Sequence, residues 1–253
     1  MAIRWLTAVL DVPAHRFEPD RRFWEGATAM KAAATKPGRE DLTTLVPDTG
    51  DAYLAMRHAS AEHSGCRLVL HVDDPGGVPE QVVGLGGRVE RNDHWAMSLR
   101  SPAGLHFGIT ACGDESRRPR PAAWPAGQRS LVDQVCIDIP PGRFDIECDF
   151  WAQITGSEHR PGNRPEFRYL PRPPEMPLRL LLQRLDDAPL DAARAHLDLA
   201  CTDLAAEVRR HVALGAAVAH EGPVWTTLRD PAAIAYCITE RDPDTGTLTS
   251  SVP

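Results

Sequence analysis

The segment from His196 to Ala216 reads HLDLACTDLAAEVRRHVALGA, and an earlier segment from Arg67 to Gly87 reads RLVLHVDDPGGVPEQVVGLGG. Each begins with a short apolar run typical of a strand and passes through an Asp-containing turn into a helix-like stretch. Each then ends in Leu-Gly followed by a small residue. The two segments resemble two copies of one unit, although the later copy begins with His and the earlier one with Arg.

The duplication extends along most of the chain. At an offset of 127 positions, as from Asp11 to Asp138, the recurring residues are Asp11, Phe17, Phe23, Trp24 and Arg57. At an offset of 129, as from Asp74 to Asp203, the recurring residues are Asp74, Leu85, Gly86 and Pro102. A two-residue length change between the blocks accounts for the second offset. Matches that keep their order over so much of the chain indicate a tandem repeat.

The two copies are separated by residues 113–129, GDESRRPRPAAWPAGQR. This stretch is rich in Pro, Gly and charge and has no hydrophobic period, which predicts a linker. We therefore expect an N-terminal domain over residues 1–112 and a C-terminal domain over residues 130–242. The polar residues 243–253 are expected to form a frayed tail.

Each half divides again into two similar units. In the C-terminal half, residues 131–139 alternate as a strand, and residues 144–155 place Phe144, Cys148 and Trp151 on one helical face. Further strands are expected at 166–170, 178–185, 196–202, 216–220, 224–230 and 233–239. A second helix is predicted from Leu204 to Leu214, with Asp203 as its N-cap and Gly215 as its C-cap. The resulting order is β-α-β-β-β, twice in each half.

The composition and the absence of several motifs disfavour some classes of protein. The net charge is −7 and 42% of the 253 residues are hydrophobic, which suits a globular protein and does not favour a nucleic-acid partner. No signal peptide or membrane-length apolar run is visible, so a cytoplasmic protein without a membrane partner is expected. The six cysteines form no CxxC pair and are expected to be mostly buried, reduced thiols. No phosphate-binding glycine loop or Ser-His-Asp pattern supports another enzyme class.

The β-α-β-β-β order and these motifs resemble the vicinal oxygen chelate superfamily, which includes glyoxalase I, bleomycin-resistance proteins and extradiol dioxygenases. The likeness is strongest to the glyoxalase-like domain proteins common in actinobacteria. The segments that carry it are QVCIDIPPGRFDIECDFWAQITG, LRLLLQRL, HLDLACTDLAAEVRRHVALGA and WTTLRDPAAIAYCI. The resemblance implies an α+β fold of tandem glyoxalase-like domains. Four βαβββ units would form two curved, partly open mixed sheets with helices on the outside.

The resemblance also implies metal-ligand positions on the concave side of the C-terminal sheet. They fall on Gln134, Gln183, His196 and Cys237, where the family's usual final Glu is replaced by Cys. This set holds no carboxylate, so we expect hard cations to bind weakly and no cofactor to be required. If a divalent metal such as Zn, Fe, Mn or Ni binds, Gln134 and His196 are the expected ligands.

The corresponding N-terminal positions, Thr7, Met56, Arg67 and Gly108, cannot chelate a metal. Arg67 is expected either to bind a ligand carboxylate or to pair with an internal acid. Trp225 is expected to pack at a sheet edge or to form an aromatic wall of the cleft, and Trp95 to occupy a similar place in the first copy. His211, which stands beside two arginines, is expected on a solvent-facing side of its helix.

Three functions are compatible with the sequence. The first is binding of a small organic molecule in the C-terminal cleft by Gln134, Gln183, His196, Trp225 and Cys237, for sequestration, resistance or metal-free chemistry. The second is a metal-dependent lyase or dioxygenase that uses Gln134 and His196. The third is a structural or dimerisation module. A small-molecule partner and a monomer or homodimer are expected, and the residues do not decide whether the protein is an enzyme.

Overall fold

The computed structural model describes residues 2–35, 41–60, 64–92, 96–186 and 191–249, and Trp95 falls outside them. The strands of the N-terminal half are β1 (Ile3–Pro13), β2 (Lys31–Ala32), β3 (Leu42–Val46), β4 (Leu54–Ala59), β5 (Gly65–Val72), β6 (Arg88–Asn92), β7 (Met97–Arg100) and β8 (His106–Ala111). Its helices are α1 (Phe17–Thr28) and α2 (Val78–Gly84). The strands lie in the order β2-β3-β4-β1-β5-β8-β7-β6, with β1–β4 and β5–β8 parallel and the other pairs antiparallel.

The C-terminal half repeats this arrangement. Its strands are β10 (Arg129–Ile139), β11 (Arg160–Pro161), β12 (Phe167–Leu170), β13 (Arg179–Arg184), β14 (Arg194–Cys201), β15 (Ala217–Glu221), β16 (Trp225–Arg229) and β17 (Ala235–Glu240), and its helices are α3 (Phe144–Thr155) and α4 (Leu204–Ala213). Their order is β11-β12-β13-β10-β14-β17-β16-β15. The predicted tandem of βαβββ units is therefore confirmed, and one bridge between Ala195 and Cys66 joins the two mixed sheets.

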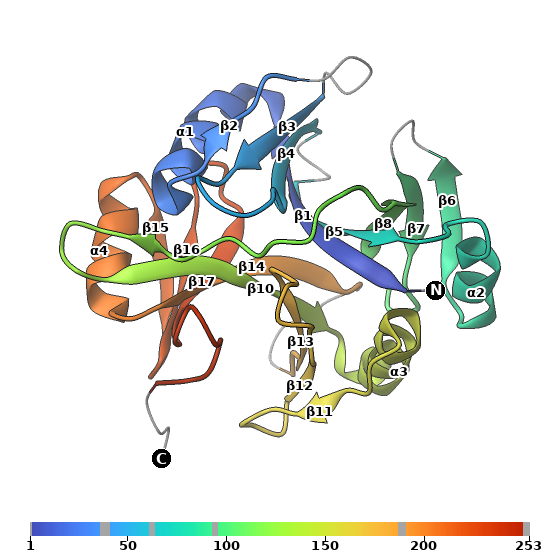
Figure 1. Ribbon diagram of the computed structural model, residues 1–253. Coiled ribbons are helices and arrows are strands. Elements are labelled where there is room, and N and C mark those ends of the chain that lie inside the picture. Colours follow the sequence, from blue (N-terminus) through green and yellow to red (C-terminus); the bar gives the residue numbers. More distant parts are fainter. Residues whose placement is uncertain (1, 36–40, 61–63, 93–95, 187–190, 250–253) are drawn as a thin grey trace.

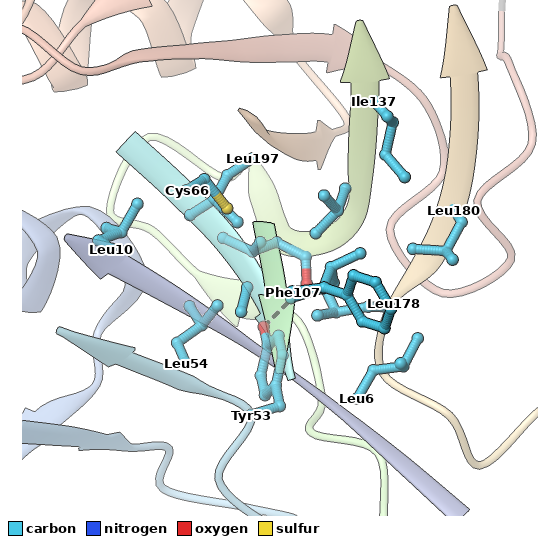
Figure 2. Packing of buried hydrophobic residues seen from close by; sticks show 14 of the residues in the cluster. Leu6, Leu10, Tyr53, Leu54, Cys66, Phe107, Ile137, Leu178, Leu180 and Leu197 are labelled. Carbon is cyan, nitrogen blue, oxygen red and sulfur yellow. Dashed lines mark hydrogen bonds between the residues drawn. The ribbon is translucent and has the colours of Figure 1, made fainter. Parts of the chain in front are cut away.

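The central strands have one apolar and one mixed face because side chains alternate across a strand. In β14, Leu197 and Leu199 enter the large apolar core, whereas His196 and Asp198 point to the opposite face. Figure 2 shows residues of both halves, among them Tyr53, Phe107 and Leu180, packed into this one core. The two sheets thus share a core, and their other faces remain available for a site.

The first helix of each half packs against the other half (Figure 1). On α1, the Trp24 indole donates a hydrogen bond to Asp230 Oδ2 over 3.1 Å and lies edge-on to Tyr236. On α3, Trp151 lies edge-on to Phe107, and Glu147 accepts a hydrogen bond from the backbone N–H of Ala103 over 2.8 Å. Equivalent helices of the two halves therefore make equivalent contacts, each with the other half.

Helix α4 begins at Leu204 as predicted, but it ends one residue earlier than predicted, at Ala213 with Leu214 as its C-cap, and one of its side chains was misplaced. Asp203 caps the helix by accepting a hydrogen bond from the Ala206 N–H over 2.9 Å. His211 is fully buried, not solvent-facing, and its ring lies 2.9 Å from the Tyr236 hydroxyl and 3.3 Å from Glu207. The sequence prediction was wrong here because α1 of the other half covers this side of the helix.

The linker and the tail are more ordered than expected. Arg129, assigned to the linker, already begins β10 and pairs with the short strand β9 (Ala122–Ala123). Beyond β17 the tail folds back, so that Arg241 bridges to Leu248, and Arg118 donates to the carbonyl of Asp244. These hydrogen bonds hold polar residues that were expected to fray. None of the described helices combines the length and apolarity needed to cross a membrane.

Candidate functional site

The concave face of the C-terminal sheet encloses a cavity of about 300 Å³. Five of the six residues proposed from the sequence as ligand contacts line it, namely Gln134, Gln183, His196, Trp225 and Cys237. The sixth, Arg67, lies in a separate hollow between the halves, whose wall also includes His196 and Asp138. The structure therefore brings the C-terminal candidates together in one cavity, and Arg67 shares the second hollow with only one of them, His196.

His196 stands on the cavity floor between two carboxylates. Its Nδ1 lies 3.2 Å from Asp138 Oδ2, and its Nε2 lies 3.3 Å from Asp198 Oδ1. Burial disfavours the charged ring, but the surrounding Cys136, Asp138 and Cys237 outweigh it, so the pKa of His196 is raised well above its ordinary value. Burial also opposes ionisation of Asp198, but the hydrogen bond and charge of His196 hold the pKa of that carboxyl below its ordinary value.

Gln134 connects this pair to a half-buried cation, Arg179. Its amide oxygen accepts two hydrogen bonds from Arg179, from Nε over 2.8 Å and from a terminal guanidinium nitrogen over 2.5 Å. Its amide nitrogen donates to Asp198 Oδ2. Burial lowers the pKa of Arg179 from its ordinary high value. Gln134 thus orients Asp198 so that its other oxygen, Oδ1, faces His196 Nε2.

A second ion pair lies at the end of the cavity where the tail folds back. Arg241, which lines the cavity, donates to Asp133 Oδ1 over 2.6 Å, and both side chains are almost fully buried. Asp133 reaches Arg241 from the position where the pairing of β10 with β14 shifts register, between Val132 and Gln134. Asp133 Oδ2 and Arg241 Nε have no hydrogen-bond partner within the protein, so this pair retains capacity for a polar ligand or water.

Two thiols flank His196. The Cys136 thiol donates to Gln183 Oε1 over 3.4 Å, and burial raises the pKa of Cys136. Cys237 Sγ lies 3.6 Å from His196 Nε2 and 3.3 Å from the Thr227 hydroxyl. Cys237 is half-buried and lines the cavity, so it is not a core residue.

The cavity walls are mainly apolar and aromatic. Trp225 forms one wall, with the Arg164 guanidinium carbon 5.2 Å from its ring centroid. The other apolar wall residues are Phe167, Leu181, Leu185, Val224, Ala235 and Leu248. Such a combination of apolar walls with a few convergent polar groups is typical of small-molecule sites.

The N-terminal sheet carries different residues on the corresponding face, where Thr7, at the position of Gln134, lies 2.9 Å from His71 Nε2. Val9, Leu42, Ala55, Val69 and Ala96 pack together as a separate apolar cluster. By the repeat offsets, Val9 corresponds to Cys136 and Val69 to Asp198. Gly108 stands where Cys237 stands in the other half, and a Cβ there would lie 3.2 Å from a methyl of Val69. Aliphatic side chains thus replace the thiol and the carboxylate.

The question raised by Arg67 is settled in favour of an internal acid. Arg67 donates to Asp11 Oδ2 over 2.8 and 2.5 Å, and Arg57 donates to Asp11 Oδ1 over 2.8 Å. Strand pairing places Arg57 opposite Asp11 just as Gln183 is opposite Asp138. The expected equivalence of Met56 with Gln183 was therefore wrong by one residue, and Met56 lies in the core.

The acidic part of the site was not predicted from the sequence. The expectation that the site lacks a carboxylate is wrong, because Asp138 and Asp198 both line the cavity. Alternation could have found them, since Asp138 lies four residues after Gln134 and Asp198 two residues after His196, on the same strand faces. No sequence signal singled out Arg179 or Arg241, whose positions depend on pairing between distant strands.

The structure tests whether Gln134 and His196 could hold the divalent metal that the resemblance implies. The expected ligand Gln134 does not fit, because Arg179 occupies its amide oxygen and places a positive charge beside it. A different group, Cys136, His196 and Asp198, has its donor atoms within 4.8 Å of one another. Metal binding through Gln134 is therefore not supported by the geometry.

Two curved sheets of βαβββ units around a concave cavity define the vicinal oxygen chelate class. The family model for the glyoxalase-like domain matches twice, over residues 7–110 and 134–239, so the chain belongs to the glyoxalase-like domain family. No curated protein sequence matches the chain significantly.

Solved structures share the fold at low sequence identity. A mutant of 4-hydroxymandelate synthase from Streptomyces coelicolor is 15% identical, with a TM-score of 0.61, over 98% of this chain and 95% of that one. The 2,3-dioxygenase LapB from Pseudomonas sp. KL28 is 11% identical, with a TM-score of 0.58, over 98% and 97% of the two chains. A catechol 2,3-dioxygenase is 13% identical, with a TM-score of 0.58, over 98% and 92%. These likenesses concern the fold alone.

Proposed function

We propose that the C-terminal half binds a small organic molecule in its cavity, with the apolar body of the ligand against Trp225 and a polar group toward His196. The observation that carries the proposal is the contrast between the halves. The C-terminal concave face keeps a cavity of about 300 Å³, whereas aliphatic side chains pack together on the N-terminal concave face. A volume of this size suits a molecule of one or two rings.

The charges around the cavity favour a ligand that carries both a donor and an acceptor. Arg241 Nε is a buried donor without a hydrogen bond, and the Asp198 carboxylate, whose Oδ1 faces His196 Nε2 at 3.3 Å, is an acceptor on the cavity lining. Leaving a buried donor unpaired is costly, so a ligand that accepts from Arg241 and donates to Asp198 gains affinity and specificity. Trp225 and Phe167 supply apolar surface for a planar body.

Sequestration is the role that we assign to this site. Asp138 and Asp198 hold the His196 ring between them, and Gln134 is held by Arg179. Binding and retention require only the shape and the polar contacts described above. A metal-dependent lyase or dioxygenase that relied on Gln134 would first have to displace Arg179 from it.

A fragment screen with a cavity-filling variant tests this proposal. Small aromatic acids, amines and phenols are screened by thermal shift and the hits are measured by calorimetry. Leu181→Trp places a bulky ring in the cavity, and Val212→Trp adds the same ring at an exposed site on α4. We expect hits on the wild type and on Val212→Trp, and at least a tenfold loss of affinity, about 1.4 kcal/mol, in Leu181→Trp.

Equal affinity in all three proteins would place the binding elsewhere and contradict the proposal. A screen without hits on the wild type would do the same. Circular dichroism on each variant shows whether a loss of binding comes from unfolding.

A further inference from the structure

We infer that the hollow between the two halves binds a small organic anion, with a phosphate or carboxylate group on an apolar body. The volume of this hollow is about 640 Å³, against about 300 Å³ for the concave cavity. Guanidinium groups from both halves lie in its wall, namely those of Arg67, Arg100, Arg194 and Arg229. Such a concentration of arginines in a hollow of this size is suited to an anionic small molecule.

The hollow is built from equivalent positions of the two copies. The bridge that joins the two sheets lies in its wall. The equivalent residues that line it include three pairs at the repeat offsets, which are Arg100 and Arg229, Leu105 and Ile234, and Asp11 and Asp138. Both halves are therefore needed to form this space, in contrast to the concave cavity, which belongs to the C-terminal half.

The two equivalent arginines are anchored in the same way. Arg100 donates to the Gly104 carbonyl over 3.3 Å, and Arg229 donates to the Ala233 carbonyl over 3.0 Å. Each hydrogen bond thus joins an arginine to the carbonyl four residues later and holds the guanidinium group at the wall. A positioned guanidinium group binds phosphate or carboxylate oxygens through parallel N–H donors.

The counter-ion of this arginine is present in only one half. Arg100 pairs with Glu90, which also lies 2.9 Å from His106. In the C-terminal half Ala219 takes the place of Glu90, at the same shift of register in the strand pairing. Arg229 therefore has no carboxylate partner within the part of the chain that the structure describes, and it can pair with a ligand.

Arg194 adds a cation that the N-terminal half lacks. It begins β14 at the position that Gly65 holds in β5, and its exposed side chain forms no ion pair with any described residue. Both acids of the wall are engaged, since two arginines hold Asp11, and Asp138 lies 3.2 Å from the His196 ring. Four guanidinium groups against two engaged carboxylates produce a positive potential that attracts an anion.

The remaining wall favours an organic ligand over a bare anion. Its apolar side chains include those of Cys66, Leu105, Ala193, Ile234 and Ala235. An apolar body placed against these residues is removed from water, which inorganic phosphate cannot exploit. The inference does not rest on the function proposed for the concave cavity, because different residues bind in the two spaces.

Calorimetry with phenyl phosphate and phthalate on the full-length chain tests the inference. Both probes carry an aromatic ring and two negative charges, and inorganic phosphate is the comparison ion without an apolar body. We expect each organic probe to bind at one site, and inorganic phosphate to bind about tenfold more weakly. Sodium chloride should weaken the binding by screening partly exposed charges. The tighter organic probe identifies the preferred head group.

Four variants locate the bound probe. Arg194→Gln and Arg229→Gln should each lower the affinity by about tenfold, because each removes a cationic donor from the wall. Arg209→Gln removes an exposed arginine of α4 that lies outside the hollow, so it should retain the affinity. Leu181→Trp, which fills the concave cavity, should retain it as well. Circular dichroism on each variant verifies folding, and if one of the two wall variants does not fold, the other decides.

The absence of binding of both organic probes to the wild type would overturn the inference. Unchanged affinity in Arg194→Gln and Arg229→Gln would also overturn it, and a loss in Leu181→Trp alone would place the anion in the concave cavity. An equal loss in Arg209→Gln would show that net charge, and not this hollow, determines binding. Inorganic phosphate that binds as tightly as phenyl phosphate would contradict the role of the apolar wall.

Discussion

The two halves of the chain have the same strand order, but their concave faces carry different residues. In the C-terminal half, His196 lies between Asp138 and Asp198 on the floor of a cavity. In the N-terminal half, Asp11 is held by two arginines, Thr7 contacts His71, and aliphatic residues replace the thiol of Cys136 and the carboxylate of Asp198. A duplicated fold can therefore keep its core and lose its site, because the two depend on alternate residues of the same strands.

Removing the equivalent buried tryptophan of either half should lower the free energy of unfolding to a similar extent, and this is the largest expected effect. Trp24→Ala and Trp151→Ala each remove a fully buried indole from the contact between the halves. Each should lower the free energy of unfolding by about 3–5 kcal/mol, measured by urea denaturation. A loss of stability confined to one variant would show that the two equivalent contacts between the halves do not contribute equally.

Exchanging concave-face residues should have unequal effects. Val69→Asp places a carboxylate in the N-terminal aliphatic cluster, where Val69 is 1% exposed, and should cost roughly 2–4 kcal/mol. Asp198→Asn removes the charge but keeps a side chain that can hydrogen-bond both Gln134 and His196, so it should change stability by less. Denaturant unfolding of both variants measures the difference, and equal costs would contradict the contrast between the faces.

The equivalent buried acids of α1 and α3, Asp20 and Glu147, should contribute differently to the pH dependence of stability. Burial, with the nearby charge of Asp230, raises the pKa of Asp20 to about 8, while the equivalent Glu147 faces Ser101 and no second acid. A carboxyl with a raised pKa stabilises the fold while protonated, so its contribution is lost as pH rises from about 4 through 8.

Asp20→Asn should therefore be more stable than the wild type at pH 9, by on the order of 1–3 kcal/mol, and similar to it at pH 4. Thermal unfolding across this pH range measures the effect, with Glu147→Gln as the matched variant. A wild-type slope that persists in Asp20→Asn would show that other groups cause it.

The smallest expected effect is that of Arg67→His, which gives the N-terminal half the residue of the C-terminal one. Arg57 continues to hold Asp11, so the loss should be about 1 kcal/mol. Urea denaturation of Arg67→His and of the wild type measures this loss. A loss as large as that of Trp24→Ala would contradict the view that Arg57 alone can hold Asp11.

The repeat and the strand periodicity made most of the fold predictable. The pattern from Phe144 to Trp151 predicted α3, and Asp203 predicted the start of α4, because local spacing and capping determine both. Five of the six proposed ligand contacts share one cavity, since their strands carry recognisable family motifs.

Long-range packing explains what the sequence did not reveal. His211 is buried only because a helix of the other half covers it. The one-residue error at Met56 arose because an offset in sequence is not a register in a sheet. Asp198 was visible two residues after His196, but its role depends on Gln134 and Arg179, which meet through strand pairing.

Crystallographic fragment soaking tests the contrast between the halves most directly. Crystals of the full-length chain soaked with small planar acids and amines should show density between Trp225 and His196. No fragment should be found within the aliphatic cluster around Val9 and Val69. Density within the N-terminal cluster, or an empty C-terminal cavity after soaking with confirmed binders, would contradict the assignment of function to the second half.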